Sequence, residues 1–234
     1  MSETSIDNRP LKPRRVRSFV LRTGRMTSGQ QRALDELWPQ FGIEYNTAHL
    51  SLDQLFGRNA PRMIEIGFGT GEALAQYAQI HPEMDCLGIE VHRPGAGHLM
   101  LQIQRHRIGN IRISCHDAVE VLAQQLPPHS IDAIHIFFPD PWHKTRHHKR
   151  RLIQTAFADI LAQSLKPGGV LRLATDWQDY ANHMLAVLDA HSGFNNVAGN
   201  KKFVERPDDR PLTRFERRGH RLGHGVWDLH YIRR

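Results

Sequence analysis

The chain has 234 residues, and 31 Lys and Arg against 24 Asp and Glu give it a formal net charge of +7 and an isoelectric point of about 9.8. This length suits one ordinary domain with extensions, and the excess of cations favours a polyanionic partner, either nucleic acid or an acidic membrane face. No run of 18 apolar residues occurs, the N-terminus lacks the apolar segment of a signal peptide, and Cys86 and Cys115 form no C-x-x-C pair, so we expect a cytoplasmic protein without a membrane span.

The N-terminal part is polar and basic. Residues 1–12 are polar and contain prolines, which predicts a disordered arm, and residues 13–25 contain five arginines and no acid. The charge is therefore clustered. An amphipathic helix is predicted at 28–38, and we treat residues 1–58 as a basic N-terminal extension.

From residue 62 onward, short apolar runs alternate with segments of helical periodicity. The runs predict strands at 63–66, 86–90, 111–115, 131–138, 170–174 and 226–232. Helices are expected directly after the glycines at 67–71 and at 95–106, 118–126, 152–165 and 177–190. This alternation predicts an α/β fold over residues 59–234: a doubly wound, mostly parallel sheet with helices on both faces.

Acidic side chains stand at or beside the carboxyl ends of five predicted strands. They are Glu65, Glu90, Asp117, Asp140 and Asp176. Ligands of doubly wound sheets bind beyond the carboxyl ends of the strands, so these acids are expected to converge on one site.

The first of these ends carries a glycine loop, EIGFGTG (65–71), with Gly67, Gly69 and Gly71. Glycine permits positive φ and a close approach of the backbone to a ligand. A nicotinamide-binding loop needs a small residue where this chain has Glu72, so that cofactor is not favoured. Glu65 instead suits a ligand with a cationic amino group, and Glu90 can accept hydrogen bonds from ribose hydroxyls.

The fourth strand runs into FFPDPWHKTRHHKRR (137–151). Pro139 and Pro141 cannot extend a sheet ladder, so Asp140 is presented on a stiff loop. The cations that follow indicate a substrate that carries phosphates. The alternatives are that Pro139–Pro141 is only a turn that ends the strand, and that the charged run is an ordinary solvated surface.

The glycine loop and the spaced acids resemble the motifs of class I methyltransferases, which have a Rossmann-like fold and bind S-adenosylmethionine. The resemblance implies that Glu65 lies near the methionine moiety, Glu90 holds the ribose and Asp117 meets the adenine amino group. The implied cofactor-binding set is Glu65, Gly67, Gly69, Gly71, Glu90, Asp117 and Asp140. Asp117 has an alternative role as a helix N-cap, because Asp117 and Glu120 form a capping box.

The longer string FFPDPWHK, followed by RHHKRR, resembles the bacterial tRNA (guanine-N7)-methyltransferases. The likeness continues through RSFVLRTGR (17–25), GIEVH (88–92), CHDAVE (115–120), ATDW (174–177) and TRFERRGHRLGHGVWDL (213–229). It covers nearly the whole chain from about residue 9. The motif of enzymes that methylate exocyclic amines, [DNS]-P-P-[YFW], is matched only in part by Asp140-Pro141-Trp142.

This resemblance implies methyl transfer to N7 of guanine 46 in the variable loop of tRNA, with Asp140 opposing the positive charge that develops on the purine. The implied substrate-binding residues are Lys144, Asp176, Thr213, Arg214, Phe215 and Glu216. The implied RNA-binding residues are Arg146, His147, His148, Lys149, Arg150 and Arg151. Asp176 has an alternative role as the cap of the helix that starts at 177.

A metal is not expected. His220 and His224 have i, i+4 spacing, but the glycines around them argue against a helix. Two other functions stay open. One is a non-catalytic RNA-binding protein, and the other is a methyltransferase for small molecules, which would not need the basic clusters at 14–25 and 144–151. The expected partner is tRNA, with no membrane and no obligate protein partner, and a monomer is expected.

Overall fold

The computed structural model describes residues 17–20, 24–212, 216–217 and 225–234. Several predicted site residues and basic residues lie outside this part: Arg14, Arg15, Arg22, Thr213, Arg214, Phe215, His220 and His224.

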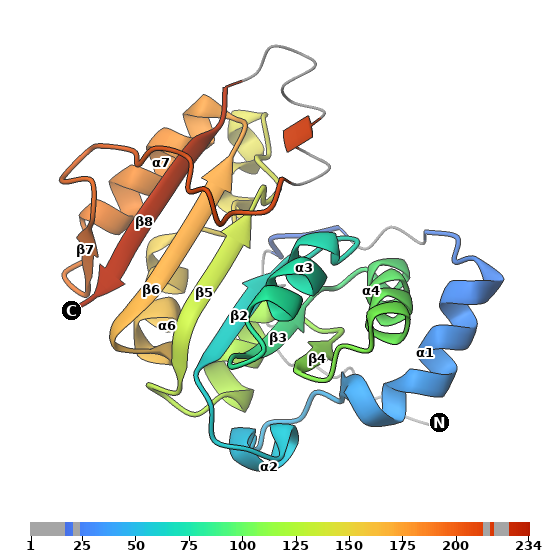
Figure 1. Ribbon diagram of the computed structural model, residues 1–234. Helices are drawn as coiled ribbons and strands as arrows, with labels where there is room; N and C mark the ends of the chain where they lie inside the picture. Colours follow the sequence, from blue (N-terminus) through green and yellow to red (C-terminus); the bar gives the residue numbers. More distant parts are fainter. Residues whose placement is uncertain (1–16, 21–23, 213–215, 218–224) are drawn as a thin grey trace, which may run out of the picture.

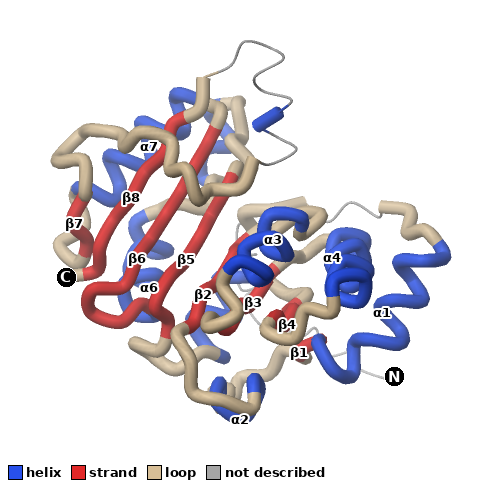
Figure 2. The backbone as a smooth tube through the Cα atoms, viewed as in Figure 1, coloured by secondary structure: helices blue, strands red, loops and turns tan. Residues whose placement is uncertain are grey.

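The centre of the described chain is an eight-stranded sheet with the order β1-β4-β3-β2-β5-β6-β8-β7 (Figures 1 and 2). Its strands are β1 (Gly42–Ile43), β2 (Arg62–Ile66), β3 (Asp85–Ile89), β4 (Ile111–Ser114), β5 (Ile131–Phe137), β6 (Leu165–Thr175), β7 (Phe194–Asn196) and β8 (Trp227–Arg233). The first six strands in this spatial order pair in parallel, and β8 pairs antiparallel with both β6 and β7. The predicted mostly parallel sheet is confirmed.

Helices cover both faces of the sheet. They are α1 (Ser28–Phe41), α2 (Leu52–Phe56), α3 (Glu72–Ile80), α4 (Arg93–His106), α5 (Ala118–Glu120), a π-helix (Val121–Gln125), a 3₁₀ helix (Thr145–Arg150), α6 (Thr155–Ser164) and α7 (Gln178–Asp189). Figure 1 shows α1, α3 and α4 on one side of the sheet and α6 and α7 on the other. The predicted doubly wound architecture is therefore confirmed.

The alternation of side chains along β2 explains this arrangement. Ile64 and Ile66 pack into the core on the side of α6 and α7, whereas Met63 packs into the core on the side of α1, α3 and α4. Because successive side chains of a strand point to opposite faces, a continuous apolar run fills both layers. Glu65, between the two isoleucines, belongs to the same face as Met63.

The structure corrects the start of one predicted strand and adds two strands that were not predicted. β6 begins at Leu165 rather than at 170, because Leu165 pairs with Ile131 and a register irregularity takes up the Lys-Pro-Gly-Gly segment. β1 and β7, which have two and three residues, were not predicted. Elements this short do not produce a readable hydrophobic period.

The later part of the N-terminal extension is integrated into the sheet layers. Thr27 and Gln30 form a capping box that starts α1, and α1 packs against α4. Gly97 of α4 allows this approach, since a Cβ there would lie 2.9 Å from the Gln30 carbonyl oxygen. None of the helices in the described part of the chain has the length and apolar character needed to span a membrane.

Candidate active site

A cleft of about 1270 Å³ lies where the carboxyl ends of β2, β3, β4 and β5 meet. Its lining includes eight of the predicted site residues: Glu65, Gly67, Gly69, Glu90, Asp117, Asp140, Lys144 and His147. These residues come from four separate segments, which the parallel topology brings to one rim. Of the five acids expected to converge at this rim, Glu65, Glu90, Asp117 and Asp140 line the cleft and Asp176 does not.

The glycine loop forms one wall of the cleft. Gly67, Gly69 and Gly71 have φ angles of 75°, 58° and 75°, in the left-handed region that favours glycine. The Gly67 N–H donates to the Ile89 carbonyl at 2.8 Å, which attaches the loop to β3. A Cβ added at Gly67 would have no neighbour within 4 Å, so the space above this residue is open to a ligand.

Glu90 ties the glycine loop to the start of α4. One of its oxygens accepts from the Gly69 N–H at 3.0 Å, and the other accepts from the N–H groups of Val91 and His92 at 2.8 and 3.0 Å. The carboxylate thus sets the shape of the cleft floor in addition to lining it.

Gly95, which was not among the predicted site residues, allows α4 to reach this loop. A Cβ at Gly95 would lie 2.1 Å from the Gly69 carbonyl oxygen, a distance at which the backbone must shift. Gly95 and Gly97 stand in a helix near its first turn, where glycine is unfavourable without a packing reason. Two glycines in an otherwise helical segment were the sequence signal from which a close packing contact could have been predicted.

Glu65 is a buried acid in the wall of the cleft, with 5% of its surface exposed. Burial, followed by the nearby charge of Glu90, raises the pKa of Glu65 to about 8. Its neighbour across the sheet is His135, whose pKa burial lowers to about 3. At neutral pH, Glu65 is therefore largely protonated, and a cationic group brought beside it would favour the ionised form.

Asp117 is the N-cap of α5, as one of its two sequence interpretations predicted, and the other interpretation, contact with adenine, stays a prediction. It caps α5, accepting from the Val119 N–H at 3.0 Å, and it also lines the cleft. Because a carboxylate has two oxygens, one cap bond leaves acceptor capacity for a ligand.

Asp140 is exposed at the mouth of the cleft on a conformationally strained loop. Phe138 and Trp142, on either side of the Pro-Asp-Pro segment, have φ angles of 53° and 47°. Each such non-glycine residue costs about 1–3 kcal/mol and persists only where neighbours hold it. The Trp142 ring N–H donates to the Ser18 carbonyl at 3.0 Å, and Arg151 Nε donates to the Pro141 carbonyl at 3.0 Å.

The basic run forms the 3₁₀ helix beside this loop, and its members differ in exposure. Arg146 and Lys149 are exposed, and the Arg150 guanidinium lies 5.0 Å from the centre of the Trp142 ring. Arg151, by contrast, is only 3% exposed and forms an ion pair with Asp179. Arg151 thus supports the Asp140 loop from inside, and we leave it out of the proposed RNA-contacting surface.

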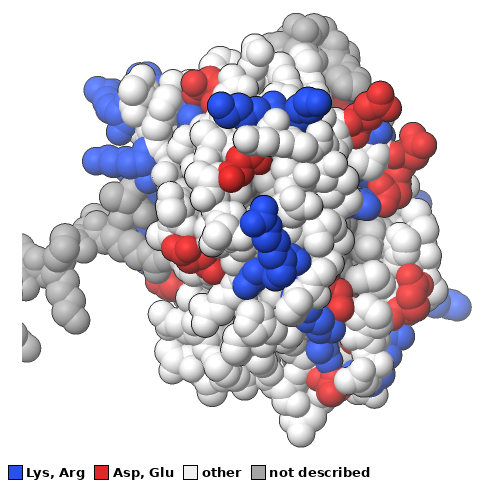
Figure 3. Space-filling view, turned by 90° about the vertical axis from the view of Figure 1, so that its left-hand side faces the viewer, with Lys and Arg blue, Asp and Glu red and all other residues white. Residues whose placement is uncertain are grey.

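The cations elsewhere on the molecule are distributed differently. On the face shown in Figure 3, on the side of β7 and β8, Lys and Arg side chains are interspersed with Asp and Glu. The visible part of that face has no broad patch of one sign, which contrasts with the run at 144–151.

Two predicted substrate residues are not in the lining of the cleft. Asp176 is partly buried, and the N-cap of α7 is Trp177, so the alternative role of Asp176 as that cap is wrong. Glu216 is fully buried, and its carboxylate accepts hydrogen bonds from Arg206 and Arg210 at 2.7 to 2.9 Å.

The segment next to Glu216 does reach the cleft. Pro211, Leu212 and Arg217 contribute to its lining, together with Trp142 and His143, and none of these five was a predicted site residue. The positions of Pro211, Leu212 and Arg217 depend on the path of the chain between β7 and β8, which periodicity does not reveal. In the described residues, no group of three or more His, Cys, Asp or Glu side chains could hold a metal ion.

Comparisons with known proteins agree on a family. A family model described as "Putative methyltransferase" matches residues 59–229. A tRNA (guanine-N(7)-)-methyltransferase of Thiobacillus denitrificans is 58% identical over 94% of this chain and 96% of its own length. One of Alcanivorax borkumensis is 52% identical over 94% of this chain and 92% of its own length. Among solved structures, the 16S rRNA methyltransferase KamB superposes with a TM-score of 0.58 at 15% identity, over 81% of this chain and 95% of that one, which supports the class I methyltransferase fold.

Proposed function

The chain belongs to the family of tRNA (guanine-N(7)-)-methyltransferases, and from this premise we propose that it transfers a methyl group from S-adenosylmethionine to N7 of guanine 46 in the variable loop of tRNA. The observation that carries the proposal is the single cleft, which joins a glycine loop and its acids to Asp140 and a basic helix. A small-molecule substrate would need no such helix.

The residues of the cleft fit S-adenosylmethionine. The open space above Gly67 can receive a ligand, and Glu65 is a buried acid beside that space whose raised pKa a cationic amino group would bring down. Glu90 and the second oxygen of Asp117 would accept from ribose hydroxyls and from the adenine amino group. When bound, S-adenosylmethionine supplies an electrophilic methyl group on a sulfonium.

The contribution of the protein to the reaction is mainly electrostatic. Guanine N7 has a free lone pair in the plane of the ring, so no base has to deprotonate it. The purine becomes cationic as its N7 is methylated, and Asp140 places a carboxylate at the cleft mouth to oppose that charge. The strained Pro-Asp-Pro loop, held by Trp142 and Arg151, keeps this carboxylate in position before the substrate arrives.

The raised pKa of Glu65 predicts a pH-dependent cofactor affinity. In the free protein Glu65 is protonated below about pH 8, and its carboxylate must form to pair with the cofactor's ammonium group. We therefore expect binding near pH 7 to release a proton and the affinity to increase from pH 6 toward 8. Calorimetry in buffers of different ionisation enthalpy measures both quantities.

The variant Glu65→Gln should remove this pH dependence and the proton release. Glu36→Gln, on the exposed face of α1, is the matched control and should keep both. A wild-type affinity that does not change between pH 6 and 8 would show that Glu65 does not face the ammonium group.

The exposed cations of the 3₁₀ helix should set the salt dependence of tRNA binding. We expect the double variant Arg146→Gln/Lys149→Gln to bind tRNA more weakly. In a plot of the logarithm of the binding constant against the logarithm of the salt concentration, its slope should be shallower by roughly 0.7–0.9 for each lost phosphate contact. KM for tRNA should increase while kcat is largely kept. The control Arg32→Gln/Arg105→Gln removes the same charge from α1 and α4, and an equal effect of both pairs would mean that only net charge matters.

The positional claim has a direct chemical test. The protein is incubated with labelled S-adenosylmethionine and unmodified tRNA, and the product is cleaved chemically at N7-methylguanosine. We expect cleavage at the variable-loop guanine. Label without cleavage at that nucleotide would overturn the proposal.

We also propose that residues 59–234 form the methyltransferase domain with residues 1–58 as a basic extension, and the family model that starts at residue 59 supports this boundary. We propose that the protein works in the cytoplasm as a monomer on tRNA, without an obligate protein partner. The chain covers 92–96% of the length of the relatives described above, in agreement with one shared activity.

A further inference from the structure

A second hollow, of about 180 Å³, lies beside the cleft between the 3₁₀ helix, the start of α6 and the loop after β4. The two spaces share Ser18, Asp117 and Leu152 in their linings, so they are neighbours across these residues. Of the remaining residues of the hollow, Lys149 and Arg150 were assigned above to the RNA backbone, and the apolar residues were assigned to no binding role.

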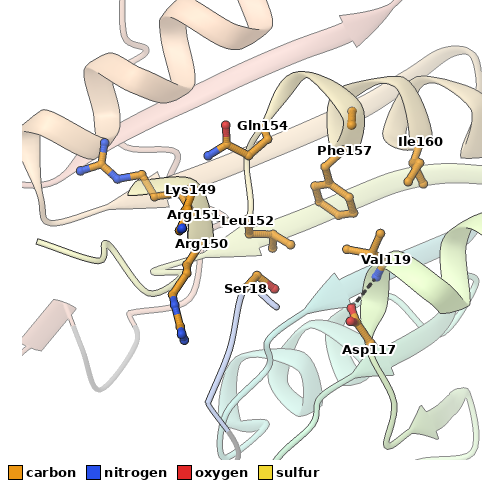
Figure 4. A pocket seen from close by; sticks show the side chains of 11 residues that line it. Ser18, Asp117, Val119, Lys149, Arg150, Arg151, Leu152, Gln154, Phe157 and Ile160 are labelled. Atoms are coloured by element: carbon orange, nitrogen blue, oxygen red, sulfur yellow. Dashed lines mark hydrogen bonds between the residues drawn. The ribbon is translucent and has the colours of Figure 1, made fainter. Parts of the chain in front are cut away.

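The inner wall of the hollow is apolar. Phe157 and Ile160 come from α6, and Figure 4 shows them to one side of Leu152, with Val119 and then Asp117 below them and Ser18 below Leu152. Leu152, Val119 and Ile160 are only partly buried, so they offer apolar surface to an occupant. A volume of about 180 Å³ is what about six water molecules occupy in the liquid, and it is enough for one planar heterocycle.

The outer wall is polar and cationic. Lys149 is exposed and Arg150 is partly exposed, and both line the hollow. Gln154 also lines the hollow; its side-chain amide group donates to the His148 carbonyl at 2.9 Å, and its amide oxygen can accept a hydrogen bond. An apolar floor, an acceptor and cations at the mouth match a nucleotide, in which a flat base with amino groups is joined to a phosphate.

We infer that this hollow is a subsite for a second nucleotide of the tRNA, a neighbour of the methylated guanine whose base enters between Val119, Leu152 and α6 while its phosphate meets Lys149 and Arg150. The inference rests on the proposed function, because the hollow adjoins the cleft that receives the target guanine. The occupant is RNA rather than a free nucleotide, since the same helix carries the exposed cation Arg146 just outside the hollow.

The test fills the hollow without touching the cleft. Ala156 is exposed, lies in the first turn of α6 and lines only the hollow, so Ala156→Phe occupies the space with little strain on the fold. We expect the tRNA dissociation constant, measured by fluorescence anisotropy, to increase about tenfold, in the range seen when one stacked base is lost. The affinity for S-adenosylmethionine in calorimetry should not change.

Two further variants make the result specific. Ala156→Leu fills less of the hollow and should give an intermediate loss of affinity. Thr155→Phe adds a ring at the neighbouring exposed position, outside the lining, and should bind tRNA as wild type does.

An abasic scan then identifies the occupant. Each nucleotide flanking the target guanine is replaced in turn by an abasic one, and one replacement should weaken binding to wild type but have no further effect on Ala156→Phe. Weaker cofactor binding by Ala156→Phe would assign the hollow to the cofactor and overturn the inference, as would unchanged tRNA affinity or additive effects at every nucleotide. Because these are binding measurements, they remain decisive even if the position of methylation proves to be different.

Discussion

Asp140→Asn is expected to lower kcat for tRNA methylation by about 100-fold while the tRNA dissociation constant stays near that of wild type. The variant keeps the shape of the side chain and removes its charge. The interaction of a carboxylate with the purine is strongest when the purine is cationic, so the loss falls on the transition state rather than on substrate binding. The magnitude follows from the effect of removing one charge-stabilising group from a preorganised site.

The measurement needs single-turnover kinetics at saturating cofactor together with equilibrium tRNA binding. Asp208→Asn is the matched control, because Asp208 is exposed and does not line the cleft. Normal turnover by the Asp140 variant would remove Asp140 from the reaction. A loss of tRNA affinity as large as the expected loss of kcat would make Asp140 a binding residue instead.

Gly95→Ala should weaken S-adenosylmethionine binding by about tenfold or more. The added methyl group would lie 2.1 Å from the Gly69 carbonyl oxygen, so either α4 or the glycine loop has to move. Such overpacking typically costs about 1–3 kcal/mol of folding free energy as well. Because Glu90 accepts hydrogen bonds from the N–H groups of both Gly69 and His92, a shift of either segment also disturbs that carboxylate.

Gly109→Ala provides the control for this prediction. A Cβ at Gly109 would have no neighbour within 4 Å, so the same chemical change should leave cofactor affinity and stability close to wild type. Calorimetry measures the affinities, and urea unfolding measures the stabilities. Wild-type cofactor binding by Gly95→Ala would mean that the glycine loop adjusts freely and is not held by α4.

The position of the site was already determined by the order of residues along the chain. Apolar runs of four to eight residues alternate with helical periods, and this pattern allows few folds other than a parallel sheet with helices on both faces. In such a sheet, a residue that follows a strand must lie at the carboxyl rim. Glu90, Asp117 and Asp140 follow strands and Glu65 is the last residue but one of β2, so these four could be assigned to one site from local sequence alone. Asp176 also follows a strand but does not line the cleft.

What each side chain does at that site was decided only by the tertiary structure. Arg151 looks like its cationic neighbours in the sequence, yet it is buried and pairs with Asp179, and Glu216 is buried and pairs with Arg206 and Arg210. Likewise, Gly95 matters because Gly69, distant in sequence, lies 2.1 Å from where its Cβ would be. The physical reason is that hydrophobic period and motif spacing report local geometry, whereas burial and ion pairing depend on which distant segments the packing brings together.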